Sequence, residues 1–263
     1  MIAVMLGGVS HRFLRVWQRN FTVYRKTWKV GFLPPLIEPL LYLVAFGAGL
    51  GALVGEVPYR GATVTYVEFL APALVSVSIM YNAFFENTYA SFVRMYYQKT
   101  FDAMLATPLS LEDVITGEIA WGATKSVIAA SLMLAVLTPF GLFHYPHSLL
   151  VVPVALVGGL AFGSIGMWFT GMMPNIEVFN LPVFLFITPM FLFSGTFFPL
   201  ENLPEWARHL ALAFPLTHLV STVRALAFGE LRPALLGHAL YLVGFTAVFF
   251  PLAMDRMRRR LIH

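Results

Sequence analysis

The sequence predicts an all-α integral membrane protein with six transmembrane helices. Hydrophobic residues make up 59% of the 263 residues and charged residues only 11%, whereas soluble domains average about 25% charged residues. Apolar runs of about 20 residues, the length that crosses a hydrocarbon core about 30 Å thick, recur along the chain. The expected spans cover residues 31–54, 69–90, 120–143, 149–171, 178–198 and 234–254.

The distribution of Lys and Arg predicts that both termini lie in the cytoplasm. Six of these residues precede the first span, three lie in or near the loop between the second and third spans (Arg94, Lys99 and nearby Lys125), and four follow the last span. The opposite side carries only four, which are Arg60, Arg208, Arg224 and Arg232. Cytoplasmic segments are enriched in Lys and Arg. Because these residues flank apolar runs and form no basic domain, nucleic acid is not an expected partner.

The spans divide the chain into three parts. Residues 1–29 form a cytoplasmic amphipathic interface helix, residues 30–254 the transmembrane domain, and residues 255–263 a basic cytoplasmic tail. The transmembrane domain includes a cytoplasmic loop at 91–119 and an external helical hairpin at 199–233. The first apolar run is longer than the ~7–15 residues of a signal-peptide core, so no cleavable signal is predicted. The absence of cysteine excludes disulfides and Cys-ligated metals.

Residues 10–29 show an amphipathic pattern with the period of a helix. Aromatic residues fall on one face, namely Phe13, Trp17, Phe21, Tyr24 and Trp28, and cations fall on the other, namely Arg12, Arg15, Arg19 and Lys26. This pattern is typical of a helix in the membrane interface, with aromatics in the acyl boundary and cations toward lipid phosphates. It fits an anchor alone or an anchor that also contacts a partner.

Polar residues inside the first two spans are candidates for a transport path. Glu38 lies roughly 10 Å into the first span by helical rise, where a carboxylate costs about 2.5–3.5 kcal/mol and should face protein or water. Asn82 and Glu86 form a stripe with Tyr89 in the second span. These residues fit a polar path, a head-group site, or packing between helices.

The loop after the second span contains a predicted helix start. Ser110 and Asp113 have the spacing of a capping box, so one helix ends near Thr107 and the next begins at Leu111. Before this break, apolar residues recur at helical spacing in a cytoplasmic segment. They fit packing against the protein itself or docking of a short helix in a groove of a soluble partner.

The stretch FFPLENLPEW, followed by a second apolar piece up to Phe228, predicts a pair of short external helices. Pro199 ends the fifth span, Pro204 suits the first turn of a helix, and Pro215 breaks that helix. Apolar residues including Trp206 and Phe214 recur at helical spacing between these prolines. The pattern fits helices that lie on the outer leaflet as well as helices that re-enter it.

Catalytic and nucleotide-binding motifs are absent from the sequence. It contains no G-x-x-x-x-G-K-[ST], no H-E-x-x-H and no G-x-S-x-G. His144 and His147 share one loop but lack a third ligand for a metal. The pattern therefore favours a transport subunit without its own energy source over an enzyme, and predicts no cofactor and no metal in this chain.

The late run FITPMFLFSGTFFPLENLPEWARHLALAFPLTHLVSTVRAL, residues 186–226, resembles the C-terminal signature of type-2 ABC exporter permeases. Within that family, EPLLYLVAFGAGLG (38–51) and TPLSLEDVITGEIAWGATK (107–125) are most similar to permeases that export lipo-oligosaccharides, the nodulation-factor exporter branch. The similarity runs over nearly the whole chain in order. Drug-export permeases share the late signature.

The resemblance implies a homodimeric permease in the bacterial cytoplasmic (inner) membrane, with two copies of a separate ABC ATPase that bind ATP and Mg²⁺. It implies ATP-driven export of an amphipathic, glycolipid-like substrate along a path at the dimer interface, built mainly from the first, second and fifth spans. It also implies that the external hairpin forms a gate, and that the interface helix lies close to the ATPase. The implied coupling helix, which docks on the ATPase, comprises Gln98, Phe101, Asp102, Met104 and Leu105.

Three other functions remain open at this point. The same family includes exporters of hydrophobic drugs or lipids, and the aromatic residues of the fifth span suit sugars, acyl chains or helix packing equally. An ATP-independent channel or secondary transporter and a membrane transferase acting on lipid-linked sugars are the alternatives from other classes. An ATPase partner would separate the exporter from both.

Overall fold

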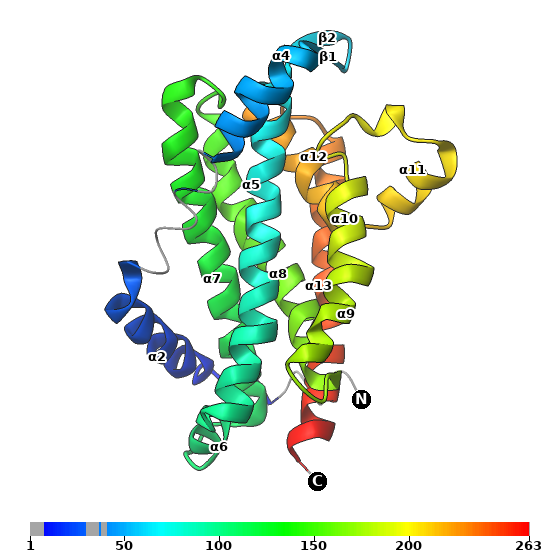
Figure 1. The fold of residues 1–263 in the computed structure, drawn as a ribbon. Helices are drawn as coiled ribbons and strands as arrows, with labels where there is room; N and C mark the ends of the chain where they lie inside the picture. The colour runs from blue at the N-terminus through cyan, green and yellow to red at the C-terminus, as the bar shows by residue number, and fades with distance from the viewer. Residues whose placement is uncertain (1–7, 30–36, 38–40, 263) are drawn as a thin grey trace.

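The structure, a computed structural model, describes residues 8–29, 37 and 41–262. Long helices stand side by side in an upright bundle (Figure 1). Within these described residues, four helical segments are long and apolar enough to cross a membrane, namely Tyr66–Tyr97, Leu111–Phe140, His147–Met172 and Ala234–Leu261. They contain the helices α5 (Tyr66–Phe85), α7 (Leu111–Leu137), α8 (Val151–Met172) and α13 (Ala234–Leu261).

These four segments correspond to the second, third, fourth and sixth expected spans. The fifth expected span is a shorter apolar helical stretch, Glu177–Phe193, which includes α9 (Asn180–Pro182), a π-helical turn (Val183–Ile187) and α10 (Thr188–Phe193). Much of the first expected span lies outside the described residues. Its described end forms a π-helical segment, Leu43–Leu50, followed by α4 (Gly51–Val54). The described part of the chain is thus an α-helical membrane bundle.

A short β-hairpin departs from the all-α expectation. Strands β1 (Glu56–Tyr59) and β2 (Ala62–Thr65) pair in antiparallel fashion, with Tyr59 opposite Ala62. The two residues between them, Arg60 and Gly61, both have positive φ, which is the backbone of a two-residue hairpin turn. Thr65 then caps α5 through a capping box with Glu68. The apolar runs of the sequence do not predict this hairpin, which lies between the first and second expected spans.

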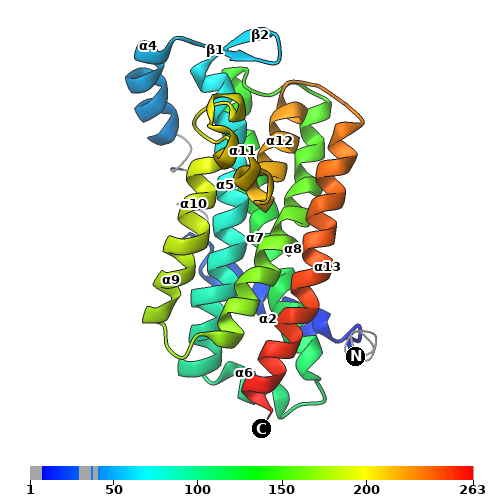
Figure 2. The same cartoon turned by 90° about the vertical axis from the view of Figure 1, so that its right-hand side faces the viewer.

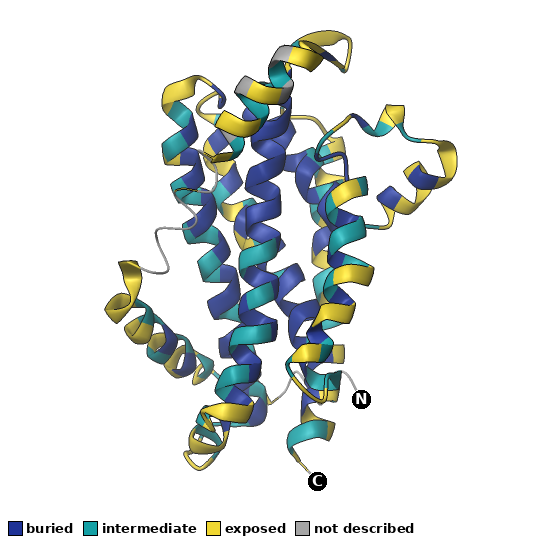
Figure 3. Cartoon of the chain, in the orientation of Figure 1, coloured by how far each residue is buried: buried dark blue, intermediate teal, exposed yellow. Residues whose placement is uncertain are grey.

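The centre of the bundle is α5, which is buried along almost its whole length between α7, α8 and α12 (Pro215–Ala227) (Figure 3). By contrast, α13 exposes apolar side chains that include Leu236 and Leu240. Helices α7 and α8 approach closely at Gly159, where a Cβ would lie 2.7 Å from the Ala123 Cα. Small residues permit such close packing in membranes.

Turning the molecule by 90° shows that its two ends differ (Figure 2). The C-terminus, the amphipathic helix α2 (Phe13–Lys26) and the short helix α6 (Thr100–Leu105) lie toward one end. The β-hairpin and α11 (Glu205–Leu212) lie toward the other. The basic segments that were assigned to the cytoplasm by charge thus gather at one end of the bundle.

Candidate functional site

Helix α2 crosses the lower part of the bundle and packs against α7 (Figure 1). Its buried face contains Val16 and Asn20. Gly117 of α7 allows this contact, because a Cβ at that position would lie 2.5 Å from the Val16 Cβ and 2.8 Å from the Phe13 carbonyl oxygen. The interface helix is therefore packed closely against the third span.

The aromatic face of α2 is half-buried against α7, and its expected place in the acyl boundary stays a prediction. Trp17 stacks on Phe21, and Phe21 and Tyr24 lie edge-on to Trp121 of α7. The Trp17 indole N–H donates to the Thr124 hydroxyl at 2.9 Å. Trp28, near the end of the described helix region, is 49% exposed. Periodicity identified the apolar face correctly, but it does not distinguish lipid from a neighbouring helix.

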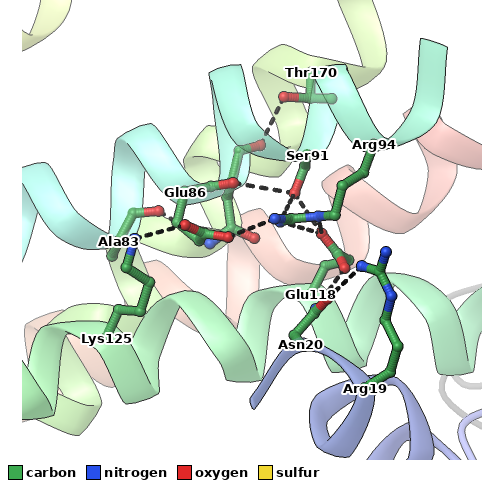
Figure 4. A network of polar contacts seen from close by, with 10 residues as sticks. Arg19, Asn20, Ala83, Glu86, Ser91, Arg94, Glu118, Lys125 and Thr170 are labelled. Atoms are coloured by element: carbon green, nitrogen blue, oxygen red, sulfur yellow. Dashed lines mark hydrogen bonds and ion pairs between the residues drawn. The ribbon is translucent and has the colours of Figure 1, made fainter. Parts of the chain in front are cut away.

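A buried charge network joins α2 to the second and third spans (Figure 4). Glu118 of α7, which is 0% exposed, accepts hydrogen bonds from Arg94 (2.9 and 2.5 Å), Ser91 (2.7 Å) and Asn20 (2.7 Å). Arg94 also donates to Glu86 at 2.7 Å. The other Glu86 oxygen lies 2.8 Å from the Lys125 ammonium group.

The network contains two carboxylates and two cations held at hydrogen-bond distance. Buried charges are tolerated when they are paired and their hydrogen bonds are satisfied, and here both carboxylates have such partners. Glu86 and Arg94 lie in or beside the π-helical turns Glu86–Ala90 and Val93–Tyr97. Such turns occur frequently at functional sites. This end of the second span is therefore the leading candidate for a functional site.

The path candidates have different surroundings. Glu86 belongs to the network and is 6% exposed. The Asn82 amide donates to the Ser78 carbonyl oxygen in its own helix at 3.0 Å, and Tyr89 donates to Asn180 at 3.3 Å. Glu38 lies outside the described residues. Whether Glu86 or Asn82 touches a substrate stays a prediction.

Sequence reasoning missed Glu118 and Arg94 as site residues. In the sequence, Arg94 is one of the cations of the cytoplasmic loop 91–119, and Glu118 is an acidic residue of the same loop. A usable signal was present: the cation Arg94 lies four residues after the end of the second expected span, and the carboxylate Glu118 lies two residues before the start of the third. Antiparallel neighbours bring such positions to the same depth, where unpaired charges are costly.

The expected coupling segment forms α6, a single short helix between Gln98 and Ala106. Phe101 is 0% exposed and belongs to a buried cluster with Phe92 and Phe179. Its expected role as a docking side chain is therefore corrected: it anchors α6 to the protein's own core. Asp102 and Gln98 are exposed, whereas Met104 and Leu105 are half-buried.

The chain before α2 is tied to this same loop. The predicted capping box is confirmed, with Ser110 accepting from the Asp113 backbone N–H at 3.0 Å. The Asp113 carboxylate also accepts from the Ser10 backbone N–H at 2.8 Å. Arg12 donates to the Pro108 carbonyl oxygen at 2.6 Å. The interface helix, the coupling segment and the third span thus form one connected unit.

At the opposite end, the external hairpin consists of α11 and α12, bent by 85°. Pro199 and Pro204 precede short helices, and Pro215 is the first residue of α12. Helix α11 projects to the side of the bundle, with Trp206 67% exposed, whereas α12 is packed inside it (Figure 1). Phe214 is half-buried at the bend.

Arg224 holds α12 in place. This buried side chain donates to the carbonyl oxygens of Phe69 (3.1 Å) and Gly195 (2.8 Å) and lies 3.8 Å from the centre of the Phe69 ring. The guanidinium group offers five donors in a rigid fork, so it can join the start of the second span to the end of the fifth. The external hairpin is thereby locked to the bundle in this structure.

The sequence that builds this bundle matches one family of membrane proteins. The model of the ABC-2 type transporter family matches residues 11–228. The chain belongs to the ABC-2 type transporter family.

Relatives of this ABC-2 transporter match nearly end to end. Nodulation protein J of Rhizobium leguminosarum bv. trifolii is 37% identical over 98% of this chain and 97% of its own length. Nodulation protein J of Rhizobium meliloti (strain 1021) is 35% identical over 95% and 94%. The inner membrane transport permease YadH of Escherichia coli (strain K12) is 25% identical over 80% of each chain.

Family membership fixes the general role and the location. This ABC-2 transporter is a multi-pass protein of the bacterial inner membrane. Members of the family are the membrane-embedded transport subunits and generally pair with an ABC ATPase, so the role of this chain is transport and not bond chemistry. Among the described residues, no group of three or more His, Asp or Glu side chains could hold a metal ion.

The close contact at Gly117 gives a testable prediction. Gly117→Ala is expected to push α2 away from α7 and to lower the free energy of unfolding by about 1–3 kcal/mol, the usual cost of overpacking. Chemical denaturation of the purified protein in mild detergent measures this change. Gly237→Ala is the control, because a Cβ there meets no atom within 4 Å; equal stability of the two variants would contradict the prediction.

Proposed function

We propose that this chain is the permease subunit of an ATP-driven ABC exporter that moves a lipo-oligosaccharide or lipid-linked glycan outward across the inner membrane. The observation that carries the proposal is the nearly end-to-end similarity to proteins named Nodulation protein J. For the first of these relatives, the match covers 98% of this chain and 97% of the relative. It agrees with the resemblance of residues 38–51 and 107–125 to the nodulation-factor exporter branch.

ATP hydrolysis is proposed to occur on a separate subunit that supplies ATP and Mg²⁺ binding. The sequence lacks a P-loop, so ATP would bind to a partner subunit. A homodimer of the permease would assemble with two copies of that ATPase. The proposed docking element is α6, whose exposed side includes Asp102 and which connects to α2 and α7 through the loop at Pro108 and Ser110. A movement of α6 would therefore reach the interface helix directly.

The proposed substrate path lies between two copies of the chain, and the external hairpin is its proposed gate. The fifth span supports an interface with lipid or a second copy, because Phe184 and Leu185 are 68% and 75% exposed. The gate residues would be Pro199, Pro204, Trp206, Phe214 and Pro215, of which the last two form the bend between α11 and α12.

Reconstitution in proteoliposomes tests the proposal. The permease is combined with candidate ABC ATPases from the same organism, and ATP hydrolysis is measured with an acylated oligosaccharide, with the same oligosaccharide lacking its acyl chain, and with hydrophobic drugs. We expect the acylated oligosaccharide to stimulate hydrolysis and the deacylated compound to leave the basal rate unchanged. Stimulation by drugs alone would assign the exporter to a drug substrate, and transport without any ATPase would exclude an ABC exporter.

A further inference from the structure

A cavity of about 330 Å³ lies where α2 meets the second and third spans. Arg19 and Tyr24 of α2 line one side, and Glu86, Arg94, Trp121 and Lys125 of the spans line the other. Ligand pockets commonly have volumes of about 300–1,000 Å³. This cavity is therefore large enough for a small polar group such as a phosphate ester.

The charges around the cavity leave one cation in excess. Glu86 and Glu118 are balanced by Lys125 and Arg94 in the buried network. Arg19 is additional: among the described residues its side chain makes one hydrogen bond, to the Asn20 amide oxygen at 2.8 Å, and no ion pair. Burial lowers the pKa of Arg19 from its ordinary value, and nearby Arg94 lowers it further, although Glu118 opposes this shift.

Hydrogen-bond donors remain available in the same cavity. A guanidinium group carries five N–H donors and an ammonium group three. Arg19 uses one of its donors and Lys125 one, the latter on Glu86 at 2.8 Å, within the part of the chain that the structure describes. Arg and Lys with free donors are the side chains that bind phosphate oxygens most strongly.

The cavity lies at the depth where the spans end on the cytoplasmic side. The second expected span ends at residue 90 and the third begins at residue 120, while the cavity is lined by Arg94 and Trp121. Tyr24 and Trp121, whose rings lie 5.5 Å apart edge-on, form an aromatic wall of the kind found at head-group level. The ligand that reaches this depth in a bilayer is a lipid head group.

We propose that this cavity binds the phosphate of an anionic phospholipid from the inner leaflet, with Arg19 and Lys125 as its donors. The lipid would neutralise the excess cation and hold α2 against α7. This site is independent of the exported substrate. It differs from a general attraction of α2 to anionic membranes, because only Arg19 among the arginines of that helix lines the cavity.

Native mass spectrometry of the purified full-length permease tests the proposal. The protein is titrated in detergent with phosphatidylglycerol, with phosphatidylcholine, and with inorganic phosphate as a competitor. We expect one phosphatidylglycerol per chain to bind in preference to phosphatidylcholine. Arg19→Gln is expected to weaken this binding about five-fold, the effect of about one cation near an anionic lipid. Arg19→Lys, which keeps the charge, should retain most of the affinity.

Arg15→Gln is the matched control, since Arg15 lies on the same helix, is exposed and bonds only to Gln18 among the described residues. We expect it to bind like the unchanged protein. Three outcomes would overturn the proposal: equal losses in the Arg15 and Arg19 variants, equal binding of the two lipids, or displacement of the lipid by an equal concentration of inorganic phosphate, which would assign the site to a soluble anion. A gel-filtration profile confirms that each variant is folded.

Discussion

Replacing Arg94 with alanine is expected to lower the free energy of unfolding by about 3–5 kcal/mol, the cost of removing one partner of a buried ion pair. Arg94 donates to Glu118 and to Glu86 and therefore connects both carboxylates of the network. Without it, Glu118 would keep only the hydrogen bonds from Ser91 and Asn20. Two neutral donors do not compensate a carboxylate that is 0% exposed.

Denaturation of the purified protein in mild detergent measures this loss, and Lys99→Ala is the control. Lys99 also pairs with a carboxylate, Asp102, at 3.9 Å, but its side chain is 67% exposed, and such surface pairs contribute about 0–1 kcal/mol. The double variant Arg94→Met with Glu118→Gln should recover much of the stability, because the stranded charge is removed and Glu86 keeps Lys125. An Arg94→Ala protein as stable as Lys99→Ala would show that the network does not hold the bundle.

Much of the architecture follows from the sequence by simple physics. Spans of about 20 apolar residues have few alternatives in a bilayer, so α5, α7, α8 and α13 occupy the expected regions. The helix start at Ser110 was predicted correctly because a capping box is a local hydrogen-bond pattern. The proline breaks before α11 and α12 are equally local. Local rules of this kind predicted the elements.

The site was less predictable because its residues meet only through tertiary contacts. Glu118 and Asn20 are distant in sequence, but the Asn20 side-chain amide nitrogen lies 2.7 Å from a carboxylate oxygen of Glu118. The aromatic face of α2 has the same period whether it contacts lipid or Trp121. Phe101 has the helical spacing of a docking residue and is buried in the protein's own core. Periodicity defines a face, and only the fold shows what covers it.

Bulky substitutions on the exposed side of α6 are expected to weaken assembly with the ATPase. Ala103 and Ala106 are exposed small residues beside Asp102, so they would allow a close approach of the proposed partner. Ala103→Trp with Ala106→Trp should weaken the complex at least about ten-fold, since a clash that costs 1.4 kcal/mol already has this effect. Co-purification of the tagged ATPase measures the result, together with ATP hydrolysis in proteoliposomes.

The choice of these alanines separates docking from folding. A change at Phe101 would open a cavity in the core and lose the complex through unfolding, whereas exposed alanines can be enlarged without moving the core. Ala213→Trp, at an exposed position in the external hairpin, is the matched control and should leave the complex intact. If the α6 variant is folded and still co-purifies with the ATPase, α6 is not the docking element. In that case α2 would be the alternative docking element. Within the connected unit of α2, α6 and α7, it is the other helix that lies outside the bundle.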